Sequence, residues 1–162
     1  MTEKRVVYYL CTILVMTIIF LFSSQGSTTT YKTSGKIVTP ITNQIKKHSD
    51  KSFESQKKET AYWKNVKLNI EKFTRKIAHI FLFTIFSGCV YLTLTTYPLS
   101  RNKIFILTFA FCILYGGIDE FHQYFVKGRT STITDVFIDS IGALLVIGFC
   151  YTKEKLSKKI NR

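Results

Sequence analysis

The sequence predicts an all-α membrane protein with four transmembrane helices and an amphipathic, lysine-rich loop between the first and second of them. Two observations predict this class: 46% of the 162 residues are hydrophobic, and yet the formal net charge is +13. A water-soluble helical bundle would show polar residues every three or four positions on its outer face. Here the apolar residues are grouped into long runs, and most lysines lie between the runs or in the tail. The length suits a single domain over residues 1–162.

Four apolar runs are long enough to cross a membrane, since about 20 helical residues span a hydrocarbon core of about 30 Å. They cover approximately residues 6–22, 77–96, 104–126 and 133–151. The first run follows Lys4 and Arg5, as a signal peptide would. Its apolar core exceeds the usual length of about 7–15 residues, however, and no A-x-A-like cleavage site follows. We therefore expect it to be retained as the first span.

The loop of residues 23–76 contains two amphipathic stretches separated by a polar one, residues 48–59. In the first stretch, Ile37, Val38, Ile41 and Ile45 share one helical face. In the second, apolar side chains recur at spacings of three and four with lysines opposite them: Trp63, Val66, Ile70 and Phe73. A helix with a tryptophan on its apolar face and lysines on the other suits an anionic lipid surface. The polar stretch is expected to be a solvated linker.

The cysteines and the positive charge exclude two other classes. Each of the four cysteines falls within an apolar run, without C-x-x-C spacing: Cys11, Cys89, Cys112 and Cys150. We expect them to pack as small hydrophobic side chains rather than to form disulfides or a zinc site. The positive charge flanks the membrane segments and no nucleic-acid-binding motif is present, so the expected partners are membrane lipids and not nucleic acid.

The distribution of positive charge also predicts an orientation. By the positive-inside rule, the lysine-rich tail and the turn with Arg101 and Lys103 should be cytoplasmic. With four spans, both termini then lie inside, which agrees with Lys4 and Arg5 near the amino terminus. The lysine-rich loop is left outside in this arrangement, which conflicts with the rule, although long loops translocate largely regardless of charge.

Four alternating spans bring the end of the first, the start of the second, the end of the third and the start of the fourth to one side of the membrane. The unusual polar residues of this chain occupy these four places: Ser23, Ser24 and Gln25; Arg75, Lys76 and His79; Asp119, Glu120, His122 and Gln123; and Arg129, Asp135 and Asp139. The opposite side carries only scattered lysines and the segment "TYPLSRNK". The topology therefore predicts one polar cluster at one membrane face.

The spacing of these residues predicts a shared pocket. Three pairs are four positions apart and so lie on one helix face each: Arg75 and His79, Asp119 and Gln123, and Asp135 and Asp139. Gly142 continues the last face and would let a neighbouring helix approach closely. A charged group near mid-bilayer costs about 2.5–3.5 kcal/mol or more, which disfavours exposure of Asp139 to lipid. We expect Arg75 and Arg129 to pair with the carboxylates inside this pocket.

Such a pocket has the groups needed for chemistry on a phosphate. Two arginines can hold phosphate oxygens in a bidentate fork. His79 can move protons near neutral pH, and a carboxylate can orient its imidazole or act as the base. The acidic group can instead hold a divalent cation through oxygen ligands, and an ion-paired plug that only fixes helix packing also explains these residues. The sequence assigns no residue as a metal ligand and names no cofactor.

Three segments in order resemble the VanZ-like membrane proteins: "RKIAHIFLF", "DEFHQYF" and "GRTSTITDVFIDSIGALLVIG". The pattern of these proteins is R-K-x-x-H, then D-E-x-x-Q-x-F, then an arginine and D-x-x-x-[N/D]-x-x-G. "FLFSSQ" after the first span also resembles the start of many members. This chain carries Asp139 where many relatives carry asparagine, which adds a negative charge. The segment of residues 46–72 follows no pattern of the family.

The resemblance implies a protein of the bacterial plasma membrane, in a family named for low-level resistance to the glycopeptide teicoplanin. It further implies a place among the lipid-active proteins grouped as lipocones, which are expected to act on lipid phosphate head groups. The activity implied is that of a lipid head-group phosphoryl transferase or hydrolase, and the resemblance points to an active site of Arg75, His79, Glu120, Arg129 and Asp135.

From the residues and the resemblance together, we assign eight site residues. The assignments are His79, Glu120 and Asp135 to catalysis, with Glu120 or Asp135 orienting His79, and Arg75, Arg129, Asp119, Gln123 and Asp139 to substrate binding. Two other functions stay open: a non-catalytic protein that shields a lipid-linked cell-wall precursor, and a small transporter or assembly factor that acts as an oligomer. Neither the substrate nor the oligomeric state follows from the sequence.

Overall fold

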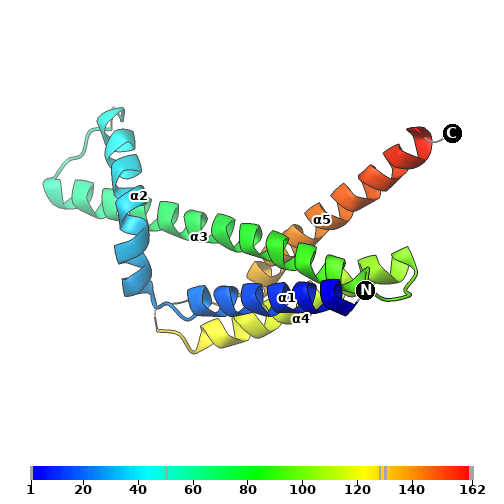
Figure 1. Ribbon diagram of the computed structural model, residues 1–162. Coiled ribbons are helices and arrows are strands. Elements are labelled where there is room, and N and C mark those ends of the chain that lie inside the picture. Colours follow the sequence, from blue (N-terminus) through cyan, green and yellow to red (C-terminus); the bar gives the residue numbers. More distant parts are fainter. Residues whose placement is uncertain (1, 50, 128, 130, 161–162) are drawn as a thin grey trace.

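A computed structural model describes residues 2–49, 51–127, 129 and 131–160 of the chain (Figure 1). These residues form α-helices and no strand: α1 (Thr2–Ser23), α2 (Ser27–Lys47), α3 (Gln56–Leu94), α4 (Arg101–Tyr124) and α5 (Ile133–Ile160). Among them α1, α3, α4 and α5 are long and apolar enough to cross a membrane. The predicted class, an all-α integral membrane protein with four spanning helices, is confirmed.

The predicted loop of residues 23–76 is mostly helical. Its first amphipathic stretch lies in α2, and its second forms the amino-terminal half of α3. The expected surface helix around Trp63 therefore continues directly into the second span. The 39 residues of α3 are about 58 Å long at a rise of about 1.5 Å per residue, which is nearly twice the hydrocarbon thickness of about 30 Å.

α3 begins inside the segment expected to be a linker, for a local reason. The side chain of Ser55 accepts a hydrogen bond from the backbone N–H of Lys58 at 3.4 Å, which caps the first turn. Glu59 in that turn carries a negative charge next to the positive end of the helix dipole. Glu59 also forms an ion pair with Lys46 of α2 at 2.9 Å, which connects the first turn of α3 to α2.

The spanning helices alternate in direction. Figure 1 shows α1 and α4 running one way and α3 and α5 the other, with the two chain termini toward the same side of the molecule. α3 contacts each of the other four helices and so forms the centre of the fold. A buried apolar cluster joins the spanning helices: Val15, Ile19, Phe83, Phe86, Val90, Cys112 and Ala143.

Apolar side chains also cover the outside of the bundle. On α1, Leu10, Leu14 and Leu21 are each about 60% exposed, at 60%, 60% and 58%. Such a surface suits contact with lipid acyl chains, which are as apolar as leucine. All four cysteines are free thiols, in agreement with the sequence.

Gly142 lies at a close contact between α5 and α3. A Cβ atom at this position would be 2.6 Å from the backbone nitrogen of Thr84 and 2.8 Å from the carbonyl carbon of Phe83. The carbonyl oxygen of Gly142 accepts a hydrogen bond from the Ser87 hydroxyl of α3 at 3.2 Å. The predicted close helix approach is therefore present, and it fixes the start of α5 against the segment of α3 that carries His79.

Candidate functional site

A cavity of about 410 Å³ lies where the spanning half of α3 begins, α4 ends and α5 begins. It is lined by Lys72, Arg75, Lys76, His79, Glu120, Gln123, Arg129, Thr132, Asp135, Ile138 and Asp139. Of the predicted site residues, only Asp119 is not part of this lining, and it contacts the cavity through His79. The structure thus brings the residues from three separated motifs into one place.

Basic side chains lie at the mouth of the cavity and acidic ones at its floor. The side chain of Lys76 is 47% exposed, and Arg75 and Arg129 are half-buried. By contrast, Glu120 is 6% exposed and Asp139 is 2% exposed. An anion approaching from outside therefore meets positive charge first, and the negative charge lies behind it.

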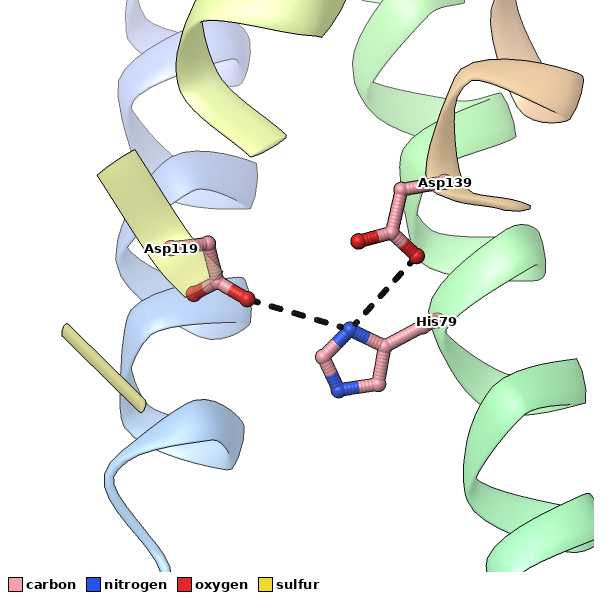
Figure 2. Close-up of side chains that lie close together, drawn as sticks. All are labelled: His79, Asp119 and Asp139. Atoms are coloured by element: carbon pink, nitrogen blue, oxygen red, sulfur yellow. Dashed lines mark ion pairs between the residues drawn. The ribbon is translucent and has the colours of Figure 1, made fainter. Parts of the chain in front are cut away.

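His79 lies between two buried aspartates. Its Nδ1 atom is 3.9 Å from Asp119 Oδ2 and 3.9 Å from Asp139 Oδ1 (Figure 2). Both distances exceed the 2.7–3.2 Å of a hydrogen bond, so neither carboxylate is directly bonded to the ring. One turn deeper, Phe83 stacks on the imidazole with ring centroids 6.5 Å apart. The carboxylates within 4 Å of His79 are therefore those of Asp119 and Asp139, whereas we expected Glu120 or Asp135 to orient it.

The carboxylate of Asp119 is held by the end of α1. Its Oδ2 atom accepts hydrogen bonds from the Ser23 hydroxyl at 2.7 Å and from Gln123 Nε2 at 2.8 Å. Gln123 also donates to the Ser23 oxygen at 3.3 Å. Ser23 is fully buried and is the last residue of α1. Because Asp119 and Gln123 are four residues apart on α4, Gln123 can reach the Asp119 carboxylate and fix its orientation.

Glu120 and Asp135 line the cavity where α5 begins, and Thr132 contacts both of them. The backbone N–H of Thr132 donates to Glu120 Oε2 at 3.1 Å, and the Thr132 hydroxyl donates to Asp135 Oδ2 at 2.8 Å. The other oxygen of Asp135, Oδ1, pairs with Lys76 Nζ at 2.5 Å. Thr132 precedes the first turn of α5, so the groups that begin this helix also position the two carboxylates.

The expected pairing of the two arginines with the carboxylates was wrong. Arg129 donates from Nε to the carbonyl oxygen of Gln25 and from a terminal nitrogen to that of Phe22, both at 3.1 Å. These carbonyls lie at and just past the end of α1, near the negative end of its dipole, and that of Phe22 also accepts from the Gln25 N–H at 3.3 Å. Burial lowers the pKa of the Arg129 guanidinium, and the nearby Arg75 lowers it further. Arg75 forms no ion pair with any residue that the structure describes.

Two lining residues that we had not assigned to the site could have been found from spacing. Lys72, Arg75, Lys76 and His79 recur at the intervals of one helix face, and all four line the cavity. His122 lies outside the lining, where its Nε2 is 3.0 Å from the Ser24 hydroxyl and its ring is 4.5 Å from that of Phe20. This agrees with the lack of a site assignment for His122.

Comparison with known proteins identifies the family of the chain. A family model described as VanZ/LLP1 matches residues 7–154, a range that includes every spanning helix core and all of the cavity lining. No curated protein and no solved structure matches the chain at a significant level. Because the match covers nearly the whole sequence, the chain belongs to the VanZ/LLP1 family.

Proposed function

We propose that the cavity binds the phosphate of a lipid-linked molecule at the outer face of a bacterial plasma membrane and catalyses transfer or hydrolysis at that phosphate. One observation carries this proposal: a cavity of about 410 Å³ combines a basic mouth with a histidine and buried carboxylates at its floor. Its volume falls within the range of about 300–1,000 Å³ that is typical of small-ligand sites.

Phosphate recognition is supported by the free donors at the mouth. Arg75 lines the cavity and has no ion pair with a described residue, so its guanidinium can bind two phosphate oxygens. The exposed Lys72 lies one turn earlier on the same face of α3. Arg129 is held against α1 by two of its nitrogens and contributes a fixed positive charge. These groups favour a phosphate at the mouth and its lipid chain along the apolar outside of the bundle.

Proton transfer is supported by the position of His79 in the cavity lining. In this mechanism the oxygen of water or of an alcohol attacks phosphorus, and the imidazole takes the proton from that oxygen. The phosphorus–oxygen bond to the leaving group breaks, and the leaving oxygen receives the proton back from the imidazole. Attack by water gives hydrolysis, and attack by an alcohol gives transfer. General acid–base catalysis of this kind contributes about 10²–10⁴-fold to the rate.

The sidedness of the proposal depends on the positive-inside rule. Because both termini lie toward the same side of the bundle, the cavity faces the side opposite the lysine-rich tail. If the tail is cytoplasmic, the cavity is external, where lipid-linked cell-wall precursors are exposed to glycopeptides. This placement gives the protein a route to teicoplanin resistance, through modification of a precursor or of its carrier lipid.

The test is turnover by purified protein in detergent or nanodiscs. Polyprenyl phosphate, polyprenyl diphosphate, lipid-linked precursor and phospholipids are supplied separately, and released phosphate or head group is measured. We expect His79→Ala to lose at least about 100-fold of the activity, while the matched variant His122→Ala retains it. Absence of turnover in every preparation, or equal rates for the two histidine variants, would rule out this catalytic role.

A non-catalytic binder is the second candidate, and the polar contacts within the cavity favour it. Lys76–Asp135 and the hydrogen bonds of Thr132 hold several charged groups in place without any reaction. A binder that shields the precursor should protect cells from teicoplanin after His79→Gln and should fail after Arg75→Ala. An enzyme should fail after both changes. Susceptibility of cells that express each variant at equal levels separates the two candidates.

A further inference from the structure

We propose that His79, Asp119 and Asp139 form a binding site for one divalent cation at the floor of the cavity. The site joins α3, α4 and α5, and each of the three residues offers one ligand atom within 4.8 Å of the other two (Figure 2). The inference deepens the proposed function and rests on it only where it concerns the phosphate; cation binding itself is independent of any lipid substrate.

The distances fit ligands of a shared ion better than a hydrogen-bonded triad. Two ligands that bind one cation at about 2.0–2.2 Å are separated by about 3.0–4.4 Å, depending on their angle. His79 Nδ1 lies 3.9 Å from an oxygen of each aspartate, within this range and beyond a hydrogen bond. The three atoms all lie within 4.8 Å of one another, so side-chain rotations that shorten the largest separation by about 1 Å would bring them to the separations that tetrahedral angles require.

One carboxylate oxygen of each aspartate lacks a partner, although Asp119 Oδ2 accepts two hydrogen bonds. Asp119 and Asp139 are each 2% exposed. Asp119 Oδ1 and Asp139 Oδ2 have no hydrogen-bond partner, although both atoms are buried. Figure 2 shows the free oxygen of Asp139 pointing into the gap toward Asp119. Among the described residues, His79 is the only basic side chain that forms an ion pair with either carboxylate.

Burial of two charges is strongly unfavourable unless they are paired or bind a metal ion. One divalent cation neutralises both carboxylates and leaves the imidazole neutral, as a nitrogen ligand requires. The hydrogen bonds from Ser23 and Gln123 fix the Asp119 carboxylate, which is the role that outer partners of metal ligands commonly have. The geometry and the charge balance therefore lead to the same site.

The ligand set indicates the class of cation. Carboxylate oxygens suit Mg²⁺ and Mn²⁺, whereas imidazole nitrogen suits Zn²⁺ and other transition metals, so the mixed set favours Mn²⁺ or Zn²⁺. Three protein ligands leave at least one position open. That position faces the cavity, because His79 and Asp139 both line it. A bound cation would separate the buried carboxylates from the phosphate and remove their repulsion. With the cation bound, His79 would be a ligand through Nδ1, and the proton transfer described above for His79 would pass to Glu120, which lines the same cavity. The loss of turnover expected for His79→Ala is the same in both cases.

The experiment measures Mn²⁺ binding to the full chain in detergent, without lipid substrate or phosphate. Equilibrium dialysis and the electron paramagnetic resonance signal of free Mn²⁺ give stoichiometry and affinity, and Zn²⁺ is then added as a competitor. We expect one Mn²⁺ per chain, displaced by Zn²⁺. Each of His79→Ala, Asp119→Asn and Asp139→Asn should weaken binding at least 100-fold. The matched variant Glu71→Gln changes a buried carboxylate two turns earlier in α3, outside the cavity lining, and should bind as the parent does.

Asp139→Asn is the variant expected to remain folded, because it keeps the side-chain size and removes a buried charge. In a chelator, its melting temperature should equal or exceed that of the parent, and added Mn²⁺ should raise the melting temperature of the parent only. Failure to bind Mn²⁺ or Zn²⁺ stoichiometrically, or equal binding by the three variants and Glu71→Gln, would overturn the site. If the parent protein binds Mn²⁺ but turns over none of the lipid phosphates, the proposed function alone is refuted.

Discussion

Replacing Gly142 by alanine tests whether the close approach of α3 and α5 holds the site together. The new Cβ would lie 2.6 Å from the Thr84 nitrogen and 2.8 Å from the Phe83 carbonyl carbon. Ordinary carbon contacts are about 3.5–4.0 Å, so the helices must separate by about 1 Å. The atoms that the methyl group meets are backbone atoms and cannot rotate away. We expect α5 to move as a unit, carrying Asp139 away from His79.

The magnitude follows from two opposing effects. Overpacking a tight contact costs about 1–3 kcal/mol, and a clash with backbone atoms should lie at the upper end. Alanine in a helix recovers about 0.5–1 kcal/mol relative to glycine. The net loss is therefore about 2 kcal/mol. At about 2–4 °C per kcal/mol for a chain of this size, the melting temperature should fall by about 4–8 °C.

The assay is the loss of monodisperse protein on size-exclusion chromatography after heating in detergent. Gly148→Ala is the matched control in the same helix, because within the described part of the chain nothing apart from its own neighbours and helix backbone lies within 4 Å of a Cβ at that position. It should melt at or slightly above the temperature of the parent. Equal melting temperatures for the two variants would refute the reasoning, since the same residue change would then cost nothing at the crossing point.

Three further substitutions test other contacts by the same measurement. Glu71→Gln should raise stability by at least about 1 kcal/mol, because Glu71 is 2% exposed and both of its carboxylate oxygens lack partners; a lower melting temperature would contradict this. Ser23→Ala should cost about 1.5–3 kcal/mol, the usual value for a hydrogen bond to a charged group, since it removes a 2.7 Å bond to buried Asp119; an unchanged melting temperature would show that the bond is replaced. Arg5→Ala removes two hydrogen bonds to Thr96 at the opposite end of the bundle, and should lower the melting temperature without changing Mn²⁺ affinity; a weaker Mn²⁺ affinity would contradict the separation of the two ends.

The spans and the clustering of the site could be predicted because each depends on a strong constraint. Long apolar runs have few alternatives to membrane helices, and alternating direction then determines which helix ends meet. The close approach at Gly142 was also predictable, since glycine on the face of Asp135 and Asp139 removes the side chain that would separate two helices. These predictions need only chain order and helix periodicity.

The pairing of individual charges could not be predicted in the same way. The sequence shows two arginines and several carboxylates near one another, and it gives no information on the carbonyl groups at the end of α1. Those carbonyls accept hydrogen bonds from Arg129, and Asp135 pairs with Lys76 of α3 instead. Which residues pair depends on helix offsets and rotations of a few ångströms, which periodicity leaves undetermined.

The continuity of α3 was missed for a related reason. The lysines and glutamates of residues 56–76 suggested a separate surface helix, because membrane spans rarely extend into such polar sequence. Both parts are helix formers with no glycine or proline between them, however, and the Ser55 cap begins the helix well before the apolar run. The change in polarity predicted the start of the membrane-spanning run, but the helix itself begins earlier, at Gln56.

The length of α3 has a mechanical consequence for regulation. A continuous helix transmits a translation or rotation of one end to the other, whereas a flexible loop would not. The amino-terminal half of α3 contacts α2, and the same helix carries Arg75 and His79 closer to its carboxyl end. A force applied to the amino-terminal half of α3 would therefore change the alignment of Arg75 and His79, and a partner bound to that half would affect the cavity without entering it.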